Sequence, residues 1–268
     1  MEKKKVLIGM SGGVDSAAAA LLLREAGYEP VGCTLRLYDN EDIGEPQEGT
    51  CCSLEAVEDA RRACRRLGME HYVFNFSSAF RRWVMDDFVE SYLAGRTPNP
   101  CVQCNRRIKF EALIRRAGEL DIPFIATGHY ARVDRDEGTG RWRLLRGLDR
   151  RKDQSYFLYP LTQAQLSRLL LPVGDYDKPA IRALAASAGI WDFLTPESRT
   201  ARISASSPMG ITGAFCRDTA GRSLSPAILW MRTAGCWGGI AGSPAIPPAS
   251  GGAWASARTG LCTYCARI

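Results

Sequence analysis

Short apolar runs alternate with amphipathic or helix-length apolar segments over the first 190 residues. Runs rich in β-branched and aromatic residues predict strands over 6–8, 29–37, 71–76, 123–127 and, as a strand or hairpin arm, 141–148. Helical spacing of apolar residues predicts helices over 17–23, 54–67, 79–93, 104–113, 161–170 and 179–187. Strands that alternate with helices in this way indicate an α/β fold built on a parallel sheet.

The turn after the first predicted strand is rich in glycine and small polar residues. It has the sequence SGGVDS over residues 11–16. Gly12 and Gly13 let the backbone approach a ligand closely, while Ser11 and Ser16 supply hydroxyl groups. The following helix would direct its unpaired N–H groups and positive dipole end at the same point. The stretch therefore predicts a phosphate site; a plain tight turn is the alternative.

The spacing of this turn differs from that of two common phosphate-binding loops. The GxxxxGK[ST] pattern needs a lysine that is missing here, and GxGxxG needs glycines that this loop does not place. SGGVDS after a strand instead resembles the PP-loop of the ATP pyrophosphatases, which split ATP between the α and β phosphates and adenylate a carbonyl oxygen. The resemblance implies ATP as cofactor, with Asp15 helping to hold Mg²⁺ on the pyrophosphate.

The net charge of +6 is concentrated towards the C-terminus. Residues 191–268 contain seven arginines, no lysine and three acidic residues, so they carry +4 and residues 1–190 carry +2. Bulk charge therefore does not argue for an RNA partner. The apolar run behind the basic N-terminus is too short for a signal peptide, and no run reaches membrane length. We expect a cytoplasmic protein with no membrane partner.

Ten cysteines in a reducing compartment favour reactive thiols, metal ligands or core residues over disulfides. Cys51 and Cys52 could bind a metal, but two adjacent cysteines cannot complete a site, so packing or a helix-entry turn is favoured. Cys64, on a predicted amphipathic helix, is expected in the core. His71 is expected to be solvated or hydrogen-bonded at the end of a strand.

A second chemically suggestive stretch is GRTPNPCVQCNRRIKF, residues 95–110. Its prolines favour an extended loop, after which Cys101 and Cys104 stand at the threshold of a helix. A thiol beside a helix start, with basic residues near, is expected to have a lowered pKa and to be a good nucleophile. Half of a zinc site and a structural pair are alternatives, because CxxC alone is ambiguous.

The strand that starts at Pro123 is expected to end at Thr127. Because ligands of open α/β sheets bind beyond the carboxyl ends of the strands, Gly128 and His129 should come near the SGGVDS loop. The basic loop RRKDQSYF, residues 150–157, is by itself typical of a solvated surface.

Five motifs now occur in one order: SGGVDS, GRTPNPCVQCN-R-IKF, ATGHYAR, KDQSYFL and LPVGDYDKP. Together they resemble the bacterial tRNA-specific 2-thiouridylases over about residues 4–189. The resemblance implies a Rossmann-like PP-loop fold with helices on both faces of the sheet, and a tRNA-uridine 2-sulfurtransferase. Such enzymes adenylate the C2 carbonyl of wobble uridine 34 in tRNAs for Glu, Gln and Lys. A persulfide sulfur then displaces AMP and leaves 2-thiouridine.

The resemblance also assigns partners and site residues. The partners are tRNA and, as persulfide donor, a sulfur-relay protein or a cysteine desulfurase. The residues expected to bind ATP are Gly9, Met10, Ser11, Gly12, Gly13, Val14, Asp15, Ser16, Leu35 and Gly128. The residues expected to contact tRNA, the first three at the target base, are Asn99, Pro100, Cys101, His129, Lys152, Asp153 and Gln154.

The catalytic residues implied by the resemblance are Cys104, as nucleophile, and Asp15. Many members have Asp where this chain has Cys101, so a helper carboxylate is absent. Cys104 is preferred over Cys101 because it directly precedes Asn105, which the motif shares. No metal ligands are expected. The chemistry of the family needs a second cysteine, in a KPDSQDICF segment that this chain lacks.

The composition changes at about Trp191, where Gly, Ala, Ser and Pro repeat without helical or strand period. Four of the six tryptophans, Trp191 included, and four of the ten cysteines lie in 191–268, which a disordered linker does not favour. If the codons are read one frame over, those of residues 197–210 can encode KPDSQDICFIPDG, the segment with the second cysteine. In the same frame, the codons of 249–256, with one preceding base, can encode GQRRGLGIS, another motif of the family. We therefore hypothesise a frameshift between residues 188 and 192, so the CxxC of Cys262 and Cys265 is not a zinc site.

The sequence thus predicts a catalytic ATP-binding domain over 1–190. Residues 191–268 are expected to be a poorly ordered tail in place of the central β domain and C-terminal β-barrel of the family. Two alternatives remain. One is another PP-loop synthetase, with a small substrate and a dispensable Cys104. The other is a remnant that binds ATP but cannot complete sulfur transfer.

Overall fold

The computed structural model describes residues 3–37 and 54–190, which belong to one compact unit, Met1–Ile228. Cys51, Cys52, the proposed frameshift and the tail lie outside the described residues, so those expectations stay predictions. In the described part of the chain, no helix is long and apolar enough to cross a membrane.

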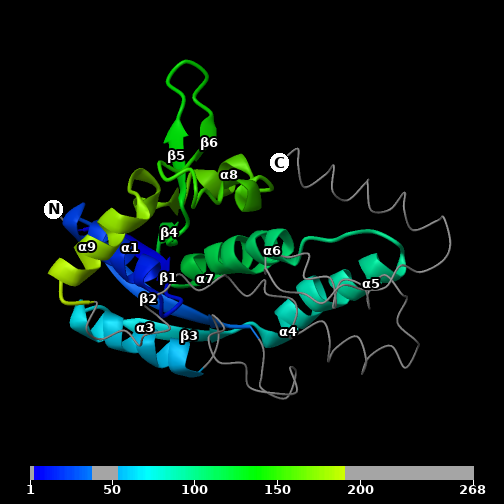
Figure 1. The fold of residues 1–268 in the computed structure, drawn as a ribbon, viewed down its shortest axis with the longest axis horizontal. Helices are drawn as coiled ribbons and strands as arrows, with labels where there is room; N and C mark the ends of the chain where they lie inside the picture. The colour runs from blue at the N-terminus through cyan, green and yellow to red at the C-terminus, as the bar shows by residue number, and fades with distance from the viewer. Residues whose placement is uncertain (1–2, 38–53, 191–268) are drawn as a thin grey trace, which may run out of the picture. The chain divides into compact units, whose positions relative to one another are not determined.

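A five-stranded parallel sheet forms the centre of the described fold (Figure 1). Its strands, in the spatial order β3-β2-β1-β4-β7, are β3 (His71–Asn75), β2 (Glu29–Arg36), β1 (Lys5–Gly9), β4 (Phe124–Ala126) and β7 (Leu169–Leu170). Central β1 pairs Leu7 with Val31 of β2 on one side and with Ile125 of β4 on the other. The predicted α/β fold is confirmed.

Helices cover both faces of the sheet, as predicted. The helices of the first part are α1 (Val14–Glu25), α3 (Leu54–Arg66), α4 (Ser77–Phe80), η1 (Arg81–Asp86) and α5 (Asp87–Leu93). Those of the second part are α6 (Pro100–Gln103), η2 (Cys104–Ala112), α7 (Leu113–Glu119), η3 (Ser155–Leu158), α8 (Gln163–Leu166), η4 (Pro172–Asp175) and α9 (Lys178–Ser187). Both η1 and η2 are π-helical turns that continue into neighbouring α-helices.

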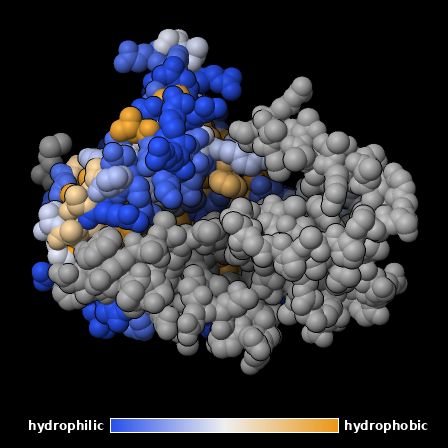
Figure 2. All heavy atoms as spheres, viewed as in Figure 1, coloured by the Kyte–Doolittle hydropathy of each residue, from blue (hydrophilic) through white to orange (hydrophobic). Residues whose placement is uncertain are grey.

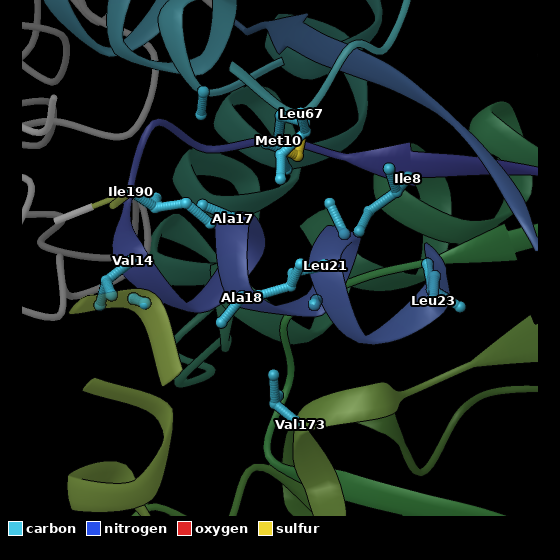
Figure 3. Close-up of a cluster of buried hydrophobic side chains, with 14 of the residues drawn as sticks. Ile8, Met10, Val14, Ala17, Ala18, Leu21, Leu23, Leu67, Val173 and Ile190 are labelled. Carbon is cyan, nitrogen blue, oxygen red and sulfur yellow. The ribbon is translucent and has the colours of Figure 1, made fainter. Parts of the chain in front are cut away.

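Alternation along β1 separates two cores. Val6 and Ile8 are fully buried in the core of α1, α3 and α9, while Leu7 points to the opposite core with α7. Helix α1 contacts neighbours on several sides: Figure 3 shows its apolar side chains directed towards Leu67, Val173 and Ile190. This explains the unbroken apolar run, because a helix buried all round needs no polar face.

A hairpin stands away from the sheet. Its strands, β5 (Ala131–Arg135) and β6 (Trp142–Arg146), pair antiparallel, and the surface over them is largely hydrophilic (Figures 1 and 2). The predicted arm at 141–148 is confirmed.

One predicted helix is wrong. Residues 161–170 form only the short α8, followed by edge strand β7. A capping box at Thr162 starts the helix, but Leu169 and Leu170 pair with Ile125 and Ala126 of β4. Pairing at the sheet edge, a non-local interaction, overrides the local helical pattern.

The sheet order reverses between β1 and β4. The chain proceeds from β1 to β2 on one side, whereas β4 lies on the other side of β1. Segments that leave the carboxyl ends of two such strands run apart, and the crevice between them is where open α/β sheets bind ligands. The SGGVDS loop leaves β1 and the Gly128 segment leaves β4 at this point.

Candidate active site

The SGGVDS loop fits tightly between β1 and α1. Gly12 has a φ of 75°, in the left-handed region that favours glycine. A Cβ atom at Gly12 would also collide with the main-chain carbonyl of Ala56 in α3. Backbone conformation and space both require glycine at this position.

The two serines of the loop bond to each other and to the backbone. Ser16 Oγ donates to the Gly13 carbonyl at 2.9 Å and accepts from the Ser11 N–H at 3.2 Å. Gly13 is the N-cap of α1 and, as a glycine, has no side chain that could cap this helix start. The first-turn N–H groups of α1 thus keep the capacity to donate to an anion.

Gly128 lies against the start of α1, as the sequence predicted. A Cβ atom at Gly128 would lie 2.9 Å from both the Asp15 carbonyl carbon and the Ser16 nitrogen. This is too close for any larger residue, so the ends of β4 and β1 meet backbone to backbone. The loop, Gly128 and the α1 start form the region that we call the nucleotide end.

The Asp15 carboxylate is held by two side chains that the sequence did not single out. Its Oδ1 accepts hydrogen bonds from Lys178 Nζ at 2.5 Å and from the Tyr130 hydroxyl at 2.7 Å. The Lys178 side chain is 6% exposed and that of Asp15 is 21% exposed. The pair joins α1 to α9, which lie far apart in the sequence.

Both partners of Asp15 have shifted pKa values with clear causes. Burial raises the pKa of Tyr130, and the negative charge of Asp15 raises it further, so the phenol stays protonated and donates. Burial lowers the pKa of Lys178, while Asp15 opposes that change by favouring the ammonium form.

The signal for these two residues was present in the motifs ATGHYAR and LPVGDYDKP. Neither motif revealed which side chain reaches the loop, because the contacts span 115 and 163 residues of sequence.

The residues fit an anionic nucleotide better than they fit a metal at Asp15. Glycine backbone and the free helix start form an anion cradle. One oxygen of the Asp15 carboxylate, Oδ1, by contrast, already accepts from an ammonium group and a phenol. Among residues 3–37 and 54–190, no three His, Cys, Asp or Glu side chains group so that they could hold a metal ion.

The other predicted ATP residues lie around the same strand ends. Met10 is buried; its N–H donates to the Cys33 carbonyl at 2.7 Å and its carbonyl accepts from Thr34 Oγ1. Val14 is fully buried in the α1 core, and Gly9 ends β1. Leu35 lies partly buried on β2, one strand away from the loop.

The cysteine motif begins a helix at residue 100. The Asn99 side chain accepts from the N–H groups of Cys101 at 3.1 Å and Val102 at 3.3 Å, and Pro100 occupies the first turn. These two residue types are well suited to starting a helix. Asn99 and Pro100, predicted to touch the target base, therefore also position the first turn of what we call the thiol helix, residues 100–112.

The two thiols of this helix lie in different surroundings. Cys101 is in the first turn and partly exposed, whereas Cys104 is 6% exposed. The buried side chains that cluster with Cys104 are Leu37, Phe76, Phe80, Val84, Met85, Ile108 and Ala112. The predicted nucleophile thus faces an apolar cluster, and the neighbouring cysteine faces the surface.

The thiol helix reaches the nucleotide end through His129. The ring of Phe110 lies 5.9 Å from that of His129, and Thr127 Oγ1 lies 2.7 Å from His129 Nδ1. Burial, helped by the positive charge of Lys109, lowers the pKa of His129 to about 3. The imidazole is therefore neutral at pH 7 and does not offer a charge to a phosphate.

Asn105, next to Cys104, connects the thiol helix to η3. Its Nδ2 donates to the Phe157 carbonyl at 3.4 Å, while its buried Oδ1 has no hydrogen-bond partner among the described residues. A buried amide oxygen without a donor is costly.

The predicted tRNA residues of the KDQ segment separate into two groups. Lys152 is exposed. Asp153 accepts from the Gly147 N–H at 2.9 Å, and Gln154 exchanges hydrogen bonds with the backbone of Tyr130 at 2.9 and 3.0 Å. Asp153 and Gln154 therefore hold the segment in place and leave Lys152 on the surface.

A glycine loop between a strand and a buried helix, at the reversal point of a parallel sheet, defines a Rossmann-like nucleotide-binding domain of the PP-loop type. Residues 4–200 match the family described as the tRNA methyl transferase HUP domain, and the chain belongs to this family.

Curated relatives agree with this assignment. The chain is 53% identical over 199 residues to the tRNA-specific 2-thiouridylase MnmA of Carboxydothermus hydrogenoformans, covering 74% of this chain and 54% of the relative. It is 48% identical over 196 residues to MnmA of Clostridioides difficile, covering 73% and 54%. The chain thus spans about half the length of these relatives. A solved 4-thiouridine synthetase–RNA complex with bound ATP is 18% identical, with a TM-score of 0.49, covering 71% of this chain and 42% of that one.

Proposed function

We propose that this chain binds ATP and carries the adenylation chemistry of a tRNA 2-thiouridylase. One observation supports it most: the glycine loop, Gly128 and the start of α1 meet at one edge of the sheet, and the thiol helix reaches that edge through His129. The 48–53% identity to enzymes of this name supports the same substrate class.

The chemistry follows from that arrangement. The N–H groups of the loop and of α1 would hold the pyrophosphate of ATP, with the adenine near Leu35. The C2 carbonyl oxygen of uridine 34 attacks the α-phosphorus and pyrophosphate leaves. A persulfide on Cys104 then attacks C2 through its outer sulfur, and AMP leaves with the oxygen, so the base is joined to Cys104 through an S–S bond. A second thiol, which the family supplies as its second cysteine, must then attack the Cys104 sulfur, which releases 2-thiouridine and leaves a disulfide between the two thiols. Mg²⁺ is proposed on the nucleotide phosphates, where it would neutralise part of their charge.

An exposed aromatic surface beside the site supports an RNA substrate. Tyr156 is 49% and Tyr159 66% exposed, and their rings lie 6.1 Å apart. Lys152 is exposed on the same loop segment. Aromatic faces stack on unpaired bases, and a lysine contacts phosphate, so this surface suits the single-stranded loop of a tRNA.

One observation favours the second candidate, a domain that binds ATP but does not complete sulfur transfer. Cys104 is only 6% exposed and clusters with apolar side chains, so sulfur delivery would require the groups that cover it to move. The absence of the KPDSQDICF segment, with its second cysteine, from this sequence also favours this candidate.

Three measurements on the full chain test the proposal. They are tRNA-dependent release of AMP and pyrophosphate from ATP, 2-thiouridine formation with a persulfide donor, and both again for Cys104→Ala. We expect AMP release by the wild type with weak or no thiolation. If the wild type forms any 2-thiouridine, Cys104→Ala should abolish it. Cys64→Ala, which alters a core cysteine, serves as the control.

The outcomes separate the candidates. AMP release that depends on tRNA supports the thiouridylase assignment. If the chain binds ATP but tRNA does not stimulate AMP release, the remnant or a synthetase with a small substrate is favoured. If the chain does not bind ATP, the thiouridylase assignment and these alternatives are all wrong.

A further inference from the structure

Lys178 reaches the nucleotide end from the last helix that the structure describes. Its ammonium nitrogen lies 2.5 Å from Asp15 Oδ1, in the first turn of α1. The Tyr130 hydroxyl donates to the same oxygen at 2.7 Å. A lysine buried to this extent is uncommon unless it is paired, and here its partner belongs to the phosphate-binding motif itself.

The position of this ammonium group is fixed by its helix. Asp177 caps α9 by accepting from the Ala180 N–H at 2.8 Å, and the Lys178 N–H donates to Asp149 at 3.2 Å. Ile181 and Ala185 of α9 are fully buried in the core around α1. Lys178 therefore has few accessible positions. Its side chain loses conformational entropy when the protein folds, and not when a ligand binds.

The charge of Asp15 matters because of where it stands. A carboxylate in the first turn of α1 places a negative charge beside the amides that would receive a pyrophosphate, and like charges at short distance in a partly buried site repel strongly. An ammonium group on the carboxylate cancels that charge. A divalent cation could do the same, but at Oδ1 it would compete with Lys178 and Tyr130.

We infer that Lys178 is the resident counter-cation of Asp15, a positioning residue that keeps the loop receptive to anionic phosphates without a metal on this carboxylate. The inference rests on the proposed ATP binding and deepens it. It reassigns Asp15 from metal ligand to lysine partner, and it places any Mg²⁺ on the nucleotide alone.

The test compares ATP binding by calorimetry in Mg²⁺ and in EDTA. For Lys178→Met, we expect the Kd for metal-free ATP to rise about tenfold or more, because Asp15 is left uncompensated. The Kd for MgATP should rise less than about threefold, since the cation can take the vacant place. The ratio of the Kd for metal-free ATP to the Kd for MgATP therefore increases. A general loss of structure would raise both Kd values and leave this ratio unchanged.

Two further variants serve as controls. Arg182→Met removes a positive charge from an exposed position of the same helix, one that acts on Lys178 and Tyr130 from a distance, and it should change the ratio much less than Lys178→Met does. Asp15→Asn combined with Lys178→Met removes both charges, and should return the Kd for metal-free ATP towards that of the wild type.

Each outcome has a distinct meaning. If Lys178→Met leaves metal-free binding intact, or strengthens MgATP binding, Asp15 is a metal ligand that the lysine merely covers, and the inference is wrong. If the wild type binds no ATP under either condition, the proposed function fails together with the inference.

Discussion

The nucleotide end and the thiol helix differ in how completely their polar groups are paired. At the nucleotide end, Asp15 is engaged by Lys178 and Tyr130, and the loop serines bond within the loop. On the thiol helix, the buried Asn105 Oδ1 has no hydrogen-bond partner within the part of the chain that the structure describes, and Cys104 clusters with apolar side chains. For the proposed function, the first region is arranged for its ligand in advance, whereas the second would have to rearrange before sulfur transfer.

The arrangement of the backbone agrees with this contrast. Helix α1 is a regular α-helix buried among neighbours, while the thiol helix contains the π-helical segment η2. A π-helical segment is less favourable than an α-helix and is frequent at functional sites. The π-helical segment spans Cys104–Ala112 and follows the short helix that contains the partly exposed Cys101.

The largest expected effect comes from breaking the nucleotide end at Gly12. Gly12→Ala forces a side chain into a left-handed backbone and into the carbonyl of Ala56. We expect the affinity for ATP to fall about a hundredfold or more, since the loop must move away from α3. Calorimetric titration with ATP measures the loss.

Gly27→Ala is the matched control for this change. Gly27 also has a positive φ, of 85°, but a Cβ there meets no atom of the described residues within 4 Å. The variant should lose about 1 kcal/mol of unfolding free energy and keep its ATP affinity. Equal affinities for the two variants would mean that the loop is not a tight cradle.

The second effect sharpens the contrast within the thiol helix. Cys101 is partly exposed and Cys104 almost wholly buried. We expect iodoacetamide to modify Cys101 at least about ten times faster than Cys104 in the native protein, because a covered thiol reacts only when its surroundings open. Peptide mass spectrometry over a time course gives both rates.

Denatured protein provides the reference, since both thiols should then react at similar rates. A native Cys104 that reacts as fast as Cys101 would show that the apolar cover is not closed, and the need for rearrangement would disappear.

Much of the site could be predicted from local sequence. The strand, glycine turn and helix at 6–23, and the approach of Gly128, follow from residue types at fixed spacing and from the geometry of parallel sheets. The contact of Lys178 with Asp15 could not be predicted, because a lysine in a KP dipeptide is ordinarily a solvated residue at a helix start. Only the packing of α9 on α1 brings it to Asp15.

The misassigned segment 161–170 shows the same limit. Its apolar residues are compatible with a helix or an edge strand, and only the presence of β4 beside it decides. Similarly, the sequence placed Cys104 next to basic residues, but it could not show that the side chain turns into the cluster of Phe76, Phe80 and Ile108.

The smallest effect concerns His129, where the two regions meet. Burial lowers the pKa of this imidazole to about 3, below the unfolded value of about 6.5. The unfolded chain therefore binds one more proton below pH 6.5, so stability is full above that value and is lost as the pH falls. The His129 contribution should be at most about 1.4 kcal/mol per pH unit between pH 6.5 and 4.5.

Urea unfolding at pH 7.5 and 5.0, for the wild type and His129→Asn, isolates this contribution. The asparagine retains a hydrogen-bonding group for Thr127 but does not titrate, so the variant should lose less stability between the two pH values. Carboxylates that protonate over the same range affect both proteins alike and cancel in the difference. If the wild type and His129→Asn had the same pH dependence of stability, His129 would be solvated. Phe110 of the thiol helix would then not bury it at the nucleotide end.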